Sequence, residues 1–247
     1  LETEDIQGAI ETECVRAVSF TGSDRAGAIV AATAARQIKP AVLELGGSDP
    51  VIVLADADLE AAADTVVLSR IINAGQSCIA AKRVIVEEPV YERFLEMMKA
   101  RLEKLTMGDP REESTDVGPI ARADLRDGLH RQVQASVEAG ARCLMGGEMP
   151  EGDGFFYPPT LLADVDDSMV AFCEETFGPI AVAMPARDAD HALEIANSTQ
   201  YGLGAAVWTA NTAKAIHMAR DIEAGQVSIN GIVKTDPRLP SGGIKRS

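Results

Sequence analysis

The sequence contains few aromatic residues, few lysines and few cysteines, and it has no long apolar run. Phe, Trp and Tyr together make up 4% of its 247 residues, and 7 lysines stand against 16 arginines. No stretch approaches the roughly 18 apolar residues that a membrane-spanning helix needs. We therefore expect neither a membrane segment nor a membrane partner.

An excess of basic charge is also missing, since the formal net charge at pH 7 is −15. A nucleic-acid-binding protein needs a basic surface to meet phosphate, so we expect no nucleic-acid partner. The four cysteines (Cys14, Cys78, Cys143 and Cys173) form no Cys-x-x-Cys pair, which favours a reducing, cytoplasmic location. The three histidines have no partner at metal-ligand spacing, so we expect no metal site.

Segments typical of strands and of helices alternate along the chain, which predicts an α/β fold. The chain begins at Leu1 rather than Met and stops after a glycine-rich turn, so we expect a piece of a longer protein. The expected strands are Val15–Thr21, Ala41–Leu45, Val51–Leu54, Arg83–Val86, Ile180–Met184, Ala205–Trp208 and Val227–Asn230, and the expected helices are Asp24–Gln37, Asp58–Asn73, Pro89–Leu105, Ala121–Ala139, Ala189–Asn197 and Thr212–Ile222.

Cys78 follows Gly75, Gln76 and Ser77 in a loop of small residues after an expected helix. Glycine lets backbone amides approach a ligand beside the loop, and a thiolate nucleophile needs open access. A structural cysteine would instead be packed in the core, without access for a substrate. The residues of the loop leave both interpretations open.

Glu44 stands in the apolar strand Ala41–Leu45, directly before Gly46 and Gly47. A lone carboxylate in a buried strand is costly unless it is paired or protonated. Its burial would suit a general base, and the alternative is a core salt bridge.

Two further segments are weaker candidates for binding. Thr21, Gly22 and Ser23 join a strand to a helix N-terminus, where backbone amides and the helix dipole favour a phosphate. An ordinary strand–helix turn has the same sequence pattern, and Gly-x-Gly-x-x-Gly is not present. Glu174–Pro179 places two carboxylates and Phe177 before a Gly-Pro turn, which by itself indicates only a solvated loop.

Five segments resemble, in order, the motifs of the aldehyde dehydrogenase superfamily. The 34 residues between Glu44 and Cys78 (78 − 44) match the family's spacing between base and nucleophile. The resemblance covers essentially the whole chain. The segments are Phe20–Ser23, Glu44–Gly47, Gly75–Cys78, Glu175–Pro179 and Pro240–Lys245.

The resemblance implies a mechanism and a cofactor, NAD or NADP. Cys78 would attack the aldehyde to give a thiohemiacetal, and Glu44 would activate the water that hydrolyses the resulting thioester. The family's oxyanion hole uses the backbone N–H of the nucleophile and an asparagine that lies upstream of Leu1. Glu175 and Phe177 match residues at the nicotinamide ribose and ring, and Gly22 and Ser23 match the turn beside the pyrophosphate.

The implied fold is a three-layer α/β/α catalytic domain with a remnant of a Rossmann-like cofactor domain. We expect residues 1–46 to be the C-terminal part of the cofactor domain, 47–231 the catalytic domain, and 232–247 a segment that returns toward the cofactor domain. The full-length protein is expected to be a homodimer or homotetramer. The 247 residues alone are expected to be inactive, because the upstream asparagine and the adenosine site are not among them.

Ser48, Asp49 and Pro50, together with Gly118–Pro119 and Leu125–Asp127, resemble the succinate-semialdehyde dehydrogenase branch of the superfamily. We therefore expect succinate semialdehyde as the substrate. Ile72 replaces an arginine that some such enzymes carry, so Arg70, Arg238 or Lys234 are the alternatives for its carboxylate. The remaining hypotheses are a different aldehyde substrate and a non-catalytic binding protein with this fold.

Overall fold

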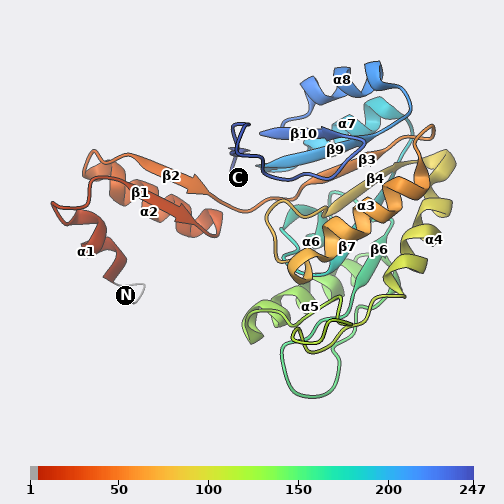
Figure 1. Ribbon diagram of the computed structural model, residues 1–247, viewed down its shortest axis with the longest axis horizontal. Helices are drawn as coiled ribbons and strands as arrows, with labels where there is room; N and C mark the ends of the chain where they lie inside the picture. The colour runs from red at the N-terminus through yellow and green to blue at the C-terminus, as the bar shows by residue number, and fades with distance from the viewer. Residues whose placement is uncertain (1–4) are drawn as a thin grey trace.

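The computed structural model describes residues 5–247 and contains a large three-layer unit with a smaller N-terminal unit beside it (Figure 1). The large unit is built on a seven-stranded sheet in the order β10-β9-β3-β4-β7-β6-β5. Neighbouring strands are parallel except for β5 and β6, which are antiparallel. The strands are β3 (Pro50–Val53), β4 (Arg83–Glu87), β5 (Arg142–Met145), β6 (Thr160–Ala163), β7 (Ile180–Ala186), β9 (Gly204–Trp208) and β10 (Gln226–Ile229).

Both faces of this sheet are covered by helices, so the apolar residues of a strand alternate between two cores. In β3, Val51 and Val53 pack with α3 and α4, whereas Ile52 packs on the opposite face with α5, α6, α7 and α8. The helices are α3 (Leu59–Ile71), α4 (Tyr91–Leu102), α5 (Ala123–Glu138), α6 (Val170–Cys173), α7 (Ala189–Asn197) and α8 (Thr212–Asp221).

Helix α3 directly precedes the segment that contains Cys78. Asp58 caps its first turn by accepting a hydrogen bond from the backbone N–H of Ala61 (3.1 Å). After Ile71 the backbone turns into a short 3₁₀ segment, Ile72–Gly75, in which Asn73 and Ala74 have φ values of 55° and 52°. Residues other than glycine rarely adopt this left-handed backbone conformation, so the backbone is strained in the turn that precedes Cys78.

The N-terminal unit consists of α1 (Asp5–Glu11), β1 (Val18–Thr21), α2 (Asp24–Arg36) and β2 (Ala41–Glu44). Strands β1 and β2 form a separate two-stranded parallel sheet, with Thr21 opposite Glu44. Its core is small and consists of Ile10, Val30 and Ala34, with Val18 and Phe20 partly buried against them. Apolar side chains such as Ile38 and Val42 are 93% and 60% exposed.

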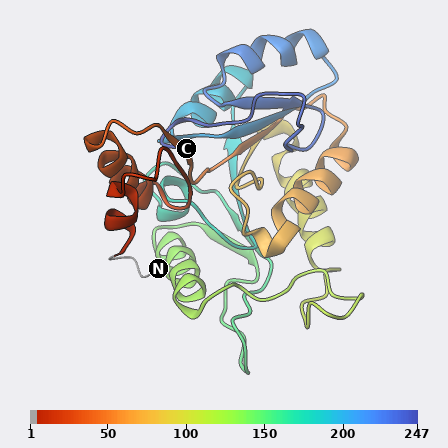
Figure 2. The same cartoon turned by 60° about the vertical axis from the view of Figure 1, so that its left-hand side comes forward.

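The C-terminal segment lies next to the N-terminal unit (Figure 2). Strand β11 (Ile244–Lys245) pairs antiparallel with β8 (Tyr201–Gly202). The guanidinium of Arg246 forms an ion pair with Asp24 at the start of α2 (2.8 Å). Residues at the two ends of the chain are thereby in direct contact.

The α/β/α architecture and every expected strand and helix are confirmed, with ends that differ by a few residues. The sequence analysis did not predict α1, β5, β6, α6, β8 or β11. Strands β8 and β11 are two residues each, which is too short for periodicity to identify them. No helix in residues 5–247 combines the length and hydropathy required to cross a bilayer.

Candidate active site

Three of the motif segments lie in contact with one another, and the space around their glycines shows how close these contacts are. A Cβ added to Gly47 would lie 2.6 Å from the backbone oxygen of Cys78. A Cβ on Gly75 would overlap the backbone of Gly178, and one on Gly46 would overlap the carboxylate of Glu175. Glycine is required at these positions because backbone or carboxylate occupies the space of a side chain.

Cys78 lies in a loop between Gly75 and Ala81, here called the Cys78 loop, and its side chain is half-buried. Burial raises the pKa of the thiol, while the ammonium of Lys82 and a hydrogen bond from the backbone of Ile79 act to lower it. The Cys78 side chain is therefore neither fully packed nor fully exposed.

Lys82 is fully buried directly behind this loop. Its ammonium donates to the backbone oxygens of Ser77 (2.8 Å) and Cys78 (2.9 Å) and lies 3.2 Å from Oε1 of Glu175. Three acceptors satisfy the three donors of the ammonium, as a buried charge requires. Burial lowers the pKa of Lys82, and the neighbouring Glu175 carboxylate opposes that shift.

Arg70 is a second buried cation beneath the same loop. It donates to the backbone oxygens of Gly75 (2.5 Å) and Ala81 (3.4 Å), one at each end of the loop. Burial lowers its pKa to about 9, and Glu175 and Asp49 partly offset the cost. Arg70 and Lys82 thus replace the backbone partners that a strained, irregular loop cannot supply.

Asp49 is buried beside these cations. Its Oδ1 accepts a hydrogen bond from the backbone N–H of Gly204 (3.0 Å), and Oδ2 has no partner within residues 5–247. Burial raises the pKa of Asp49 to about 7, with Lys82 the largest opposing influence.

Glu175, expected near the cofactor ribose, is held by the same groups as the Cys78 loop. Besides its contact with Lys82, Oε1 accepts a hydrogen bond from the backbone N–H of Gly47 (3.1 Å). The carboxylate therefore connects the Glu44–Gly47 segment to the Cys78 loop. Its neighbour Glu174 is exposed and accepts a hydrogen bond from Gln132 (2.9 Å).

Glu44 ends β2, two residues before Gly46. The expectation that its strand is buried is wrong: Ala41 and Val42 are exposed and Glu44 itself is half-buried, because β2 pairs only with β1 and one face is open. The alternative of a core salt bridge also fails, since the Glu44 carboxylate has no hydrogen-bond or ion-pair partner among the described residues. A half-buried carboxylate without a partner remains free to bind water.

Gly22 and Ser23 lie at the same sheet edge as Glu44, because β1 and β2 are parallel. The backbone N–H of Gly22 donates to the backbone oxygen of Glu44 (3.1 Å). Ser23 caps α2 by accepting from the backbone N–H of Ala26 (3.3 Å). Gly27 has a packing role, since a Cβ there would overlap the side chain of Leu45.

Phe177 is half-buried and lines, with Glu175, a groove of about 580 Å³ against α5. The residues fit a dinucleotide: a capped helix N-terminus at Ser23 suits a diphosphate, and the Glu175 carboxylate suits ribose hydroxyls.

The sequence analysis did not indicate Lys82 in this site, and it suggested Arg70 only as a candidate for a substrate carboxylate and Asp49 only as part of a motif. The signal available was their position: two basic residues, Lys82 and Arg83, directly precede the apolar run of β4, where charge is costly. A buried basic residue requires acceptors, but the sequence does not say which carbonyls supply them.

The cations considered for a substrate carboxylate are not equivalent. Arg70 is fully buried and bound to backbone oxygens, so it has no free face for a substrate. Arg238 is exposed and forms an ion pair with Asp236 (2.6 Å), and Lys234 is exposed.

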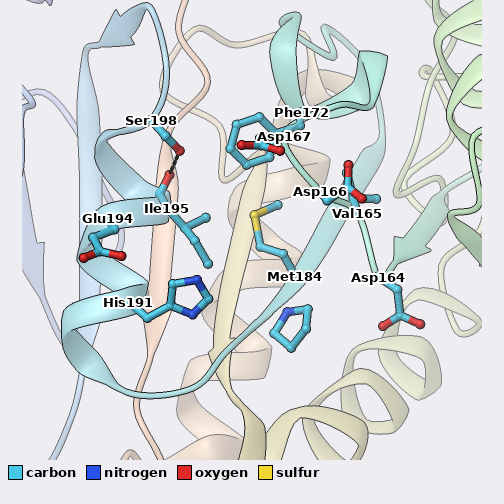
Figure 3. Close-up of a pocket in the computed structure, with 11 residues that line it drawn as sticks. Asp164, Val165, Asp166, Asp167, Phe172, Met184, His191, Glu194, Ile195 and Ser198 are labelled. Atoms are coloured by element: carbon cyan, nitrogen blue, oxygen red, sulfur yellow. Dashed lines mark hydrogen bonds between the residues drawn. The ribbon is translucent and has the colours of Figure 1, made fainter.

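A second cavity, of about 490 Å³, lies between α7 and the β6–α6 connection (Figure 3). Its floor is apolar, with Met184 and Phe172, and carboxylates including Asp166 and Glu194 stand at its sides. Neither Cys78 nor any other predicted site residue lines it. No group of three or more potential ligands among residues 5–247 is placed to hold a metal ion.

Comparison with known proteins gives the same result as the five motifs. The profile of the Aldehyde dehydrogenase family matches residues 3–247. The NAD(P)+ succinate semialdehyde dehydrogenase of Escherichia coli (strain K12) is 48% identical over 246 residues, which is 100% of this chain and 53% of that protein. The NADP(+) succinate-semialdehyde dehydrogenase of Mycobacterium leprae (strain TN) is 46% identical, over 100% of this chain and 54% of that protein.

A solved structure, the succinic semialdehyde dehydrogenase of Streptococcus pyogenes in complex with NADP+, superposes with a TM-score of 0.96 at 33% identity. The match covers 100% of this chain and 54% of that one. The chain thus spans about half the length of the curated relatives it matches. The profile, the relatives and the meeting of the motif segments at Cys78 agree, and the chain belongs to the aldehyde dehydrogenase family.

Proposed function

We propose that the protein, at its full natural length, oxidises succinate semialdehyde to the carboxylic acid with NAD or NADP, using Cys78 as nucleophile and Glu44 as base. The observation that supports this most strongly is the Cys78 loop itself. A half-exposed thiol stands on a loop whose backbone oxygens are bound by two buried cations, Arg70 and Lys82. Such fixed placement is what a nucleophile needs, and a structural cysteine has no use for it.

The steps follow from the residues. The Cys78 thiolate adds to the aldehyde carbon, and the carbonyl oxygen becomes an oxyanion that the backbone N–H of Cys78 can bind. NAD(P)+, when bound, accepts the hydride. Glu44 then takes a proton from water, and the water releases the acyl group from Cys78 as the acid.

Gly22 and Ser23 at the N-terminus of α2 would hold the diphosphate of the cofactor. Glu175 would take the nicotinamide ribose hydroxyls and Phe177 would pack near the ring. The groove beside Glu175 and Phe177 has room for this end of the molecule. To reach the ribose, the Glu175 carboxylate exchanges its contacts with Gly47 and Lys82 for ribose hydroxyls.

The proposed succinate semialdehyde specificity is supported by the curated relatives at 46–48% identity, whose names carry that substrate. A second candidate is an aldehyde without a carboxylate. It is favoured by the binding of Arg70 to backbone oxygens and of Arg238 to Asp236, which leaves neither free. Assay of succinate semialdehyde, an uncharged aliphatic aldehyde and betaine aldehyde on one preparation distinguishes them.

We further propose a cytoplasmic location, a homodimer or homotetramer, and the division at residues 46 and 231. The contact of Arg246 with Asp24 supports a C-terminal segment that belongs with the N-terminal unit.

The test separates the two proposed roles. Glu44→Gln is expected to give a burst of reduced cofactor close to one equivalent per site and then to stall, because the thioester forms but is not hydrolysed. Cys78→Ala is expected to give no burst. Stopped-flow absorbance of the reduced cofactor measures both. Rapid steady-state turnover in Glu44→Gln would assign the base to another group, and turnover in Cys78→Ala would overturn the proposed function.

A further inference from the structure

Lys82 is the group in the site that the proposed steps leave without a role. It is fully buried, it lies four residues after Cys78, and its ammonium has three acceptors: the backbone oxygens of Ser77 and Cys78 and the carboxylate of Glu175. A buried lysine is expensive to maintain, and an apolar side chain of the same length would fill the space without that cost.

The geometry of the peptide bond shows what this arrangement achieves. Residues 5–247 contain no cis peptide bond, and in a trans peptide the C=O and the N–H point in opposite directions. The oxygen of Ser77 and the N–H of Cys78 belong to one peptide unit. Because Lys82 binds that oxygen, the N–H of Cys78 is directed away from Lys82.

The next peptide unit is fixed in the same way. Lys82 also binds the oxygen of Cys78, so the N–H of Ile79 is likewise directed away from the ammonium. The backbone of Ile79 acts to lower the pKa of the Cys78 thiol, which agrees with an N–H directed toward the sulfur on the side opposite Lys82. The N–H of Cys78 therefore faces the side on which the sulfur lies, and it donates to no group within residues 5–247.

We propose that Lys82 is a positioning residue that sets the oxyanion site of Cys78 and links it to the cofactor site through Glu175. The inference rests on the proposed function. By holding two successive carbonyls, Lys82 keeps two successive N–H groups on the side of the reacting sulfur. One supports the thiolate and the other is free for the oxyanion of the aldehyde carbon.

The link to Glu175 gives this arrangement a second consequence. Glu175 is the counter-ion of Lys82, and the two lie 3.2 Å apart. When Glu175 turns to a cofactor ribose, the ammonium keeps only the carbonyls of the Cys78 loop as partners. The two sites are thereby coupled, because a buried ammonium that loses its counter-ion depends on those carbonyls alone.

The experiment compares two reactions of the same sulfur in the protein at full natural length. Alkylation of Cys78 by iodoacetamide requires the thiolate but forms no oxyanion. The burst of reduced cofactor with the aldehyde requires the thiolate and also a stabilised oxyanion. The rate of each reaction is measured as a function of pH. The plateau rates above the thiol pKa are then compared, because the thiol is fully ionised there and a change in its pKa no longer affects the rate.

In Lys82→Met the burst rate should fall about 100-fold, the loss typical of one oxyanion donor, while the alkylation plateau changes less than about threefold. The alkylation profile should also move to higher pH, because the ammonium that lowers the thiol pKa is gone. Lys99→Met on α4 is the matched control, since Lys99 is partly exposed and, among the described residues, forms an ion pair only with Glu103. The burst rate and the alkylation rate of Lys99→Met should equal those of the unmodified protein.

Equal losses in the two reactions would mean that Lys82 only maintains the fold of the loop, and no loss in either would remove its role; both outcomes overturn the proposal. If Lys82→Met does not fold, Lys82→Arg serves, because it keeps the charge but cannot reproduce the ammonium's geometry. It should lower the burst rate more than the alkylation plateau. A Cys78→Ala protein that still oxidises aldehydes would instead contradict the proposed function, whatever the Lys82 variants do.

Discussion

The N-terminal unit and the seven-stranded unit contribute different residues to the proposed active site and differ in how well they are packed. Cys78, Lys82 and Glu175 belong to the large unit, whose strands β3, β4 and β7 are covered on both faces. Glu44 belongs to a two-stranded sheet with one small core and an exposed face. The proposed nucleophile is thus fixed by a densely packed scaffold, whereas the proposed base lies on an element with few buried contacts.

This difference suits the two proposed roles. A nucleophile and its oxyanion donor must be placed to within a fraction of an ångström, which requires buried, satisfied contacts around them. A base that acts through a water molecule tolerates more variation, because the water adjusts its own position. The buried cations beneath Cys78, and the absence of any partner for the Glu44 carboxylate within residues 5–247, follow this division.

The largest expected effect tests the difference in packing directly. Phe94 is fully buried in α4, and Phe94→Ala should lower the free energy of unfolding by about 3–5 kcal/mol. Val30 is buried only in the small core of the N-terminal unit, and Val30→Ala should cost about 1.5 kcal/mol, the value for two methylenes. Urea unfolding followed by circular dichroism measures both. Equal losses would show that the two units are equally well packed.

The next effect concerns the pH dependence of the large unit. The pKa of Asp49 is raised by burial from 3.8 to about 7, so between these values the folded state binds a proton that the unfolded state releases. Stability should therefore fall as pH rises from 4 to 7, by at most about 1.4 kcal/mol per pH unit from this group.

Asp49→Asn removes the titration, so the difference in unfolding free energy between Asp49→Asn and the unmodified protein should grow in favour of the variant over that range. Urea unfolding at pH 4, 5, 6 and 7 measures it. A difference that stays constant with pH would show that Asp49 is ionised throughout, with Lys82 and Arg83 as its counter-ions.

The smallest effect concerns the contact between the units. Arg246 and Asp24 are joined by an ion pair whose arginine is 54% exposed. Exposed pairs contribute about 0–1 kcal/mol, so Arg246→Met should change the unfolding free energy by less than about 1 kcal/mol and less so at high salt. A loss of several kcal/mol would mean that this contact fixes the N-terminal unit, and that Glu44 is more firmly placed than the packing of its strand indicates.

The sequence predicted the elements that are long or strongly periodic. The apolar stripe of α4, from Tyr91 to Leu102, is buried as expected. The two-residue strands β8 and β11 were not predicted, because two residues show no periodicity. The prediction that the Glu44 strand is buried was wrong. A strand is buried only if other elements cover it, and here β1 is its single neighbour in the sheet.

The types and spacing of residues in the sequence identified the family and predicted Cys78 and Glu44 as its nucleophile and base, because chemistry depends on which groups are present and motifs record them in order. Only the tertiary structure showed that Gly47 lies against the backbone of Cys78, that Glu175 pairs with Lys82, and that Lys82 binds two carbonyls of the Cys78 loop. The reason is physical. A buried charge is stable only beside its acceptors, and which backbone oxygens are within reach is decided by how α3, β4 and the loops between them pack.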